Sequence, residues 1–127
     1  MDPLIRLKDA HSKGIIPDDV FDLTVKRFSI IADGINRIDK ASGIQYPIAY
    51  VEPSLVISAP NSNSYEYGIL FARTLPVMFD DKFQVVIQIS APLIAYGLKG
   101  TIHAILAHEF LHFLELIRKI SKMDLLS

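Results

Sequence analysis

A helical segment near the C-terminus combines an apolar pattern nearly all round the helix with the most specific motif of the chain. The segment begins at Thr101, which we expect to cap its N-terminus, and continues to about Lys122. It contains His108-Glu109-Phe110-Leu111-His112, and the residues on either side of this run are apolar at 105–107 and 113–114. A helix that is apolar nearly all round is normally buried. The pattern therefore predicts a helix enclosed by the rest of the fold.

The preceding residues predict one earlier helix and a small sheet. Apolar residues spaced by three and four, after the helix-start signal Pro17-Asp18-Asp19, indicate a helix from about Asp18 to Ile38. Strand-like patterns follow at Ile48–Ala59, Tyr65–Leu75 and Phe83–Ser90, and Asp80-Asp81 marks a turn. We expect an α+β fold, in which the two helices lie on one face of a small mixed or antiparallel sheet of three to four strands.

Length and composition limit the class of protein. At 127 residues the chain can bury a core of its own, so we expect one domain over 1–127. A formal net charge of -1 without a Lys/Arg-rich run argues against a nucleic-acid-binding protein. The sequence predicts no membrane span and no signal peptide, which favours a soluble cytoplasmic protein. Abundant Ile without Cys or Trp is typical of a thermophile.

The motif residues are the pattern expected of a zinc site. His108 and His112 stand one helical turn apart, so both imidazoles can reach one metal ion. Because the chain has no Cys, any metal must be held by His and carboxylate. Zn²⁺ lowers the pKa of a bound water towards 7 and polarises a carbonyl. Glu109, next to the first His, would take the proton of that water as a general base. The pattern predicts a zinc metalloendopeptidase.

Two other interpretations of the same residues stay open. In the first, the His and Glu side chains make ordinary hydrogen bonds within the core. In the second, the chain binds a metal without turnover, as an inactive or latent pseudo-peptidase or a metal-binding interaction domain.

A third zinc ligand is not evident in the sequence, although catalytic zinc usually has three. The extended form H-E-x-x-H-x-x-G-x-x-H is absent, because Glu115 stands at its Gly position and Arg118 at its third His. Three candidates remain: Glu115, Asp124 if the helix ends early, or a residue beyond Ser127 if the chain is truncated. For Glu115 we favour a contact with the site or a salt bridge to Lys119 over direct ligation.

The other His and Tyr residues are weaker candidates. His103 lies about 140° round the helix from His108, which predicts a packed or surface position. His11, among polar residues, is expected at the surface. A tyrosine could assist the oxyanion, but nothing in the sequence selects among Tyr50, Tyr65, Tyr67 and Tyr96.

The run from Gly100 to His112 resembles the active-site helix of zincin metallopeptidases. The small size, the lack of Cys, the preceding β region and the N-terminal helix make the whole chain similar to the minigluzincins, which are minimal archaeal peptidases. The resemblance implies a backing helix, a small sheet and an active-site helix. It also implies a zinc-binding Glu after the motif, and an edge strand that pairs with an extended peptide substrate. Phe83–Ser90 is our candidate for that edge strand.

Overall fold

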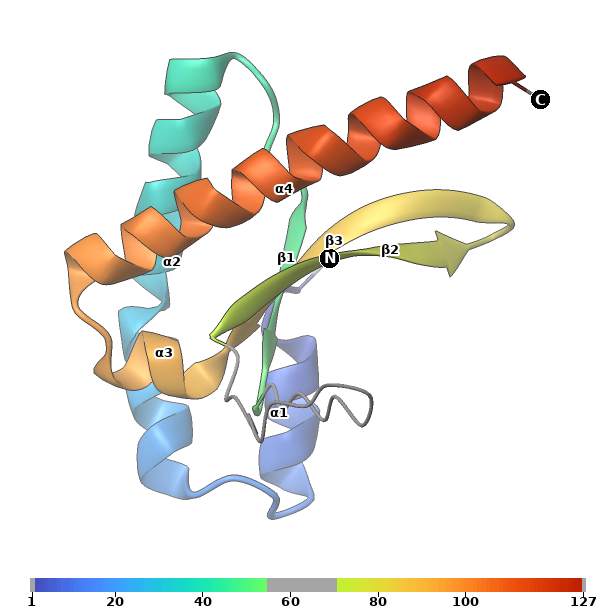
Figure 1. The fold of residues 1–127 in the computed structure, drawn as a ribbon. Coiled ribbons are helices and arrows are strands. Elements are labelled where there is room, and N and C mark those ends of the chain that lie inside the picture. Colours follow the sequence, from blue (N-terminus) through green and yellow to red (C-terminus); the bar gives the residue numbers. More distant parts are fainter. Residues whose placement is uncertain (1, 55–70, 127) are drawn as a thin grey trace, which may run out of the picture.

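The computed structural model describes residues 2–54 and 71–126, which form four helices and a three-stranded mixed sheet (Figure 1). The predicted α+β class is confirmed. The helices are α1 (Ile5–Ser12), α2 (Asp18–Ser42), α3 (Ala91–Tyr96) and α4 (Lys99–Leu126). The strands are β1 (Ile48–Glu52), β2 (Ala72–Phe79) and β3 (Lys82–Ser90).

The strands are ordered β1-β3-β2, with β1 parallel and β2 antiparallel to β3. The prediction that Phe83–Ser90 forms the edge strand is therefore wrong, because β3 is central and the outer strands are β1 and β2, of which β2 is the one in contact with α4. A strand covered on both faces has consecutive buried residues rather than strict alternation, and Val85, Val86 and Ile87 are all buried. β2 accommodates Pro76, as an edge strand can.

The helices depart from the predicted limits at several points. α2 continues to Ser42 and ends at Gly43, whose φ of 70° is readily adopted by glycine. α4 begins at Lys99, so Thr101 lies within the helix instead of capping it. α1 and α3 were not predicted. β1 ends at Glu52, and most of the predicted Tyr65–Leu75 strand lies outside the described residues.

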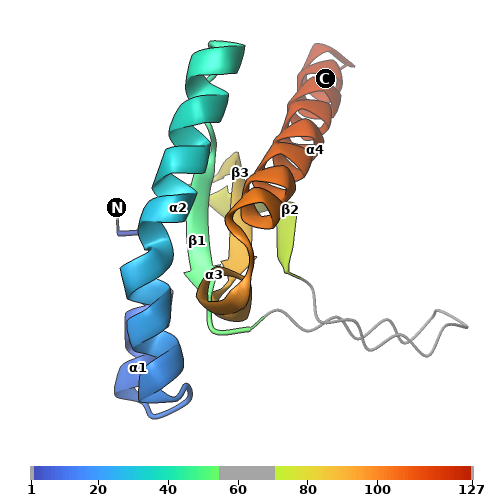
Figure 2. The ribbon, with the colours of Figure 1, turned by 90° about the vertical axis from the view of Figure 1, so that its left-hand side faces the viewer.

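α4 packs across β2 and β3, and α2 packs beside it and against α3 (Figure 2). The buried side chains form one cluster that includes Ile31 of α2, Ile87 of β3 and Leu106 of α4. Gly34 permits the close approach of the two long helices, since a Cβ there would lie 2.7 Å from a Leu106 methyl carbon.

α4 is not enclosed on all sides, which corrects the expectation of a fully buried helix. Leu106, Phe110 and Phe113 are buried against the core, whereas Ala107 and Leu111 on the other side are exposed. A three-stranded sheet and one neighbouring helix cover only one side of a helix. The motif consequently lies at the boundary between core and solvent. In the described ranges no helix is long and apolar enough to cross a membrane.

Candidate metal centre

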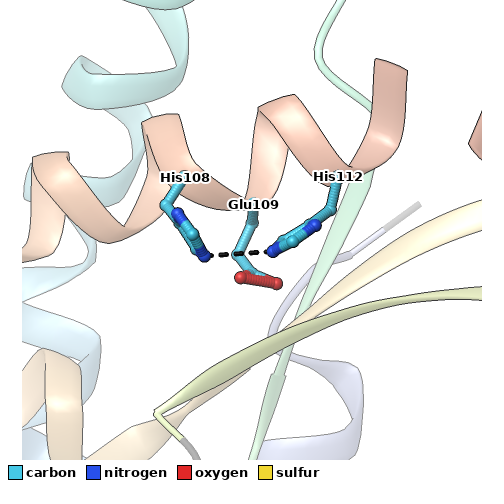
Figure 3. Close-up of side chains that lie close together, drawn as sticks. All are labelled: His108, Glu109 and His112. Atoms are coloured by element: carbon cyan, nitrogen blue, oxygen red, sulfur yellow. Dashed lines mark hydrogen bonds between the residues drawn. The ribbon is translucent and has the colours of Figure 1, made fainter. Parts of the chain in front are cut away.

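α4 presents the three motif side chains together towards the edge strand β2 (Figure 3). The Nε2 atoms of His108 and His112 lie 3.0 Å apart and are joined by a hydrogen bond. Their rings are nearly perpendicular, at an interplanar angle of 89°. Ligand atoms of His108, Glu109 and His112 all lie within 4.8 Å of one another. Local helix geometry brings the predicted residues together, since residues i and i+4 share a face.

This donor set fits a zinc ion. Zn–N bonds in proteins are about 2.0–2.1 Å long, so two nitrogens 3.0 Å apart are both within reach of one ion. The two imidazoles are exposed, which leaves the neighbouring coordination positions open to water and substrate. Among the residues that the structure describes, this is the one group of three or more His and acidic side chains able to hold a metal ion.

Glu109 differs from its two neighbours because it is only 7% exposed. Figure 3 shows its carboxylate on the strand side of the helix, beneath the two imidazoles. The Thr74 hydroxyl of β2 donates to Glu109 Oε1 over 3.0 Å and lies 3.1 Å from the carbonyl oxygen of the same residue. A buried carboxylate needs such a partner, because removing a charge from water is costly.

The structure distinguishes the two acidic candidates for the third ligand. Glu115 lies beside His112, with its Oε2 3.6 Å from Nδ1, the ring nitrogen on the far side from the paired Nε2 atoms. Glu115 thus contacts the back of a candidate ligand, as favoured from the sequence. Asp124 does not fold back, because α4 continues to Leu126 and places its backbone about 18 Å along the axis from His112. That alternative is wrong.

A cleft of about 620 Å³ opens between α4 and the edge strand β2, and the motif residues form part of its wall. Apolar, acidic and basic side chains line it together: Phe71, Ala72, Arg73, Thr74, Ile105, His108, Glu109, His112, Glu115, Leu116 and Lys119. An open cleft that places polar groups beside apolar ones is the form expected of a binding site.

The remaining sequence candidates lie away from this cleft. His103 faces α2, where its Nε2 donates to the Ile30 carbonyl over 2.9 Å; of the two positions expected for it, packed or surface, it takes the packed one. His11 stacks on Phe21 at 3.9 Å between ring centroids and lies at hydrogen-bond distance from Asp18. Neither Tyr50 nor Tyr96 lines the cleft. Tyr65 and Tyr67 are outside the described residues.

Two side chains that support the site were not predicted. Besides Thr74, the buried Tyr46 donates its hydroxyl to the Leu106 carbonyl over 2.7 Å and stacks on Phe110, 5.5 Å between centroids. Burial, and secondarily the negative charge of Glu109, raise the pKa of the Tyr46 phenol well above its usual 10.0. The sequence carried no signal for Thr74, because its pairing with the fully buried Ile87 is set by the strand register.

Comparison of this chain with models of known protein families, with curated proteins and with solved structures found no match in any of the three.

Proposed function

We propose that this protein is a zinc-dependent peptidase that uses Glu109 as its general base. The observation that supports this most is the convergence of two exposed imidazoles and one buried carboxylate on the wall of an open cleft. Exposed nitrogens favour a metal accessible to substrate, whereas a carboxylate held out of water is suited to proton transfer. The zincin-like motif noted in the sequence supports the same chemistry.

In this proposal the imidazoles, the carboxylate and the edge strand have separate roles. His108 and His112 would bind the metal through their Nε2 atoms. Zinc, when bound, supplies an activated water and polarises the scissile carbonyl. Glu109 would accept the proton released from that water and pass it to the leaving amine. β2, the outer strand beside the cleft in the described part of the sheet, would pair with an extended peptide segment.

One observation favours a second candidate function, a metal-binding domain without peptidase activity. The described residues bring only two imidazoles and Glu109 together, and Glu115 contacts the other face of His112. If Glu109 itself completed the coordination, no base would be left for hydrolysis. The two functions differ in a measurable way, because both bind zinc and only the first cleaves peptides.

Replacing Glu109 by Gln tests the proposal directly. We expect the Glu109→Gln protein to retain one zinc per chain while its peptide cleavage falls by about 100-fold or more, because the amide cannot accept the proton. Metal content is measured by elemental mass spectrometry and cleavage by mass spectrometry of a peptide library. Asp22→Asn, the same type of change at an exposed position of α2, is the matched control.

Three results would decide among the alternatives. Cleavage by Glu109→Gln at the wild-type rate would refute the assignment of the base. Stoichiometric zinc in a wild-type protein that cleaves no peptide would support the metal-binding domain instead. Absence of zinc at saturating concentration would refute both functions.

A further inference from the structure

Thr74 stands where an apolar residue would be expected. It lies in β2, and its register partner in β3 is Ile87, which is fully buried beneath α4. The neighbouring position on this face of β2, Ala72, is also buried. The hydroxyl of Thr74 points to Glu109 of α4, 35 residues away in sequence. A polar side chain at such a position requires a polar partner.

The hydroxyl faces two acceptors that belong to the same residue. Its oxygen lies 3.0 Å from the carboxylate Oε1 of Glu109 and 3.1 Å from the backbone carbonyl oxygen of Glu109. A hydroxyl has one proton to donate and can also accept, so it satisfies one of these acceptors at a time. An ionised carboxylate is the stronger acceptor of the two. Thr74 therefore donates to Oε1.

This contact joins the base on α4 to the edge strand β2. Among the described residues, Thr74 provides the only hydrogen-bond donor to the Glu109 carboxylate.

We propose that Thr74 is a positioning residue for the base: its hydroxyl holds the Glu109 carboxylate beneath the two imidazoles (Figure 3). This inference rests on the proposed peptidase function for its effect on rate, but its structural part can be tested alone. It assigns the edge strand a second role, because the strand that would bind an extended peptide also orients the base.

The test compares Thr74→Val with Thr74→Ser. Valine keeps the branched shape and removes the hydroxyl, whereas serine keeps the hydroxyl and removes a methyl group. We expect both proteins to bind one zinc, with kcat of the Val variant reduced about 10- to 100-fold at little change in KM, because a misplaced catalytic group costs that much. The Ser variant should remain within about threefold of wild type. Thr24→Val, which removes a buried hydroxyl between α2 and α3, controls for a general loss of packing.

A second readout does not depend on activity. Crystal structures of the zinc-loaded variants should show the Glu109 carboxylate displaced in Thr74→Val and in its wild-type position in Thr74→Ser. Thr74→Ala offers a second variant without the hydroxyl if the Val protein does not fold.

Each outcome supports or overturns the proposal. A Val variant with the kcat of wild type, or an unmoved Glu109 carboxylate in the Val and Ala structures, would overturn it. A Ser variant as slow as the Val variant would also overturn it, because the methyl group and not the hydroxyl would then matter. If wild-type protein cleaves no peptide, the proposed function fails, and the carboxylate position alone decides the role of Thr74.

Discussion

Two side chains, one from the segment before β1 and one from β2, bind α4 at points three residues apart along the helix. Tyr46 binds the carbonyl of Leu106, and Thr74 binds Glu109. Both bonds join residues far apart in sequence, by 60 and 35 positions. At the scale of single residues, the motif is therefore local in sequence, but side chains distant in sequence hold it in position.

Tyr46→Phe should test the first of these bonds. Loss of the hydroxyl should reduce the free energy of unfolding by about 1 kcal/mol at pH 8, the usual net value of a hydrogen bond. The pKa of Tyr46 is raised by folding, so above about pH 10 the unfolded phenol ionises while the folded one stays neutral. Above this pH, the free energy of unfolding of wild type should fall by about 1.4 kcal/mol per pH unit relative to that of the Phe variant.

Urea denaturation of both proteins at pH 8 and pH 11 measures this difference. Tyr96→Phe is the control, because Tyr96 is 63% exposed. A stability difference between wild type and Tyr46→Phe that stays constant from pH 8 to pH 11 would contradict the explanation.

At this scale, the sequence predicted contacts between residues of one helix but not contacts between residues far apart along the chain. The pairing of His108 with His112 follows from helix periodicity alone, as does the position of His103 on another face. Thr74 and Tyr46 could not be identified, because their partners are set by how strands and helices pack. The contact between Glu115 and His112 was predictable for the same reason as the motif, since the two residues lie on one helix, three positions apart.

At the scale of elements, the β2–β3 hairpin positions the cleft. Its two-residue turn places both Asp80 and Asp81 at positive φ, 50° and 63°, as in a type I′ turn. The sequence predicted the turn from these two residues, but it did not predict which strand of the hairpin forms the edge. The alternation of apolar and polar side chains predicts which face of a strand is buried, but not which strands lie beside it. In the sequence, only the consecutive apolar residues Val85, Val86 and Ile87, which are buried in the structure, indicate that β3 is central.

Asp81→Gly should stabilise this hairpin. A left-handed conformation costs a non-glycine residue about 1–2 kcal/mol, which glycine avoids. The greater flexibility of glycine in the unfolded chain offsets about 0.5–1 kcal/mol of this gain. We expect a gain of about 0.5–1 kcal/mol in the free energy of unfolding, measured by urea denaturation. Lys13→Gly is the control, because Lys13 has a φ of -87° and gains no such relief. A loss of stability in Asp81→Gly equal to that of the control would contradict the turn assignment.

At the scale of the whole molecule, α4 lies over a small sheet with one side buried and the other side exposed. The α+β class, the helix from Asp18 and the C-terminal helix followed from hydrophobic periodicity. The short helices α1 and α3 did not, because eight and six residues provide too few turns to establish a period. The exposed outer side of α4 was also not predicted, since an apolar pattern gives no information about how much surface the rest of the fold can cover.

This arrangement places the candidate metal site at the boundary between core and solvent. Phe110, within the motif run, and Leu106, two residues before it, both belong to the buried cluster. The imidazoles therefore emerge from a packed helix and not from a loop, so their positions are set before any ligand binds. A preorganised pair of this kind is expected to bind metal without rearrangement of the backbone.

The central claim is that His108 and His112 bind one zinc ion through their Nε2 atoms. Anomalous X-ray scattering at the zinc edge, from crystals of wild-type protein grown with zinc, tests it most directly. We expect one strong peak about 2.0–2.1 Å from both Nε2 atoms, with the Glu109 carboxylate beneath it and α4 unmoved. A fully zinc-exposed crystal with no peak between the two imidazoles, or with its peak on other residues, would contradict the claim.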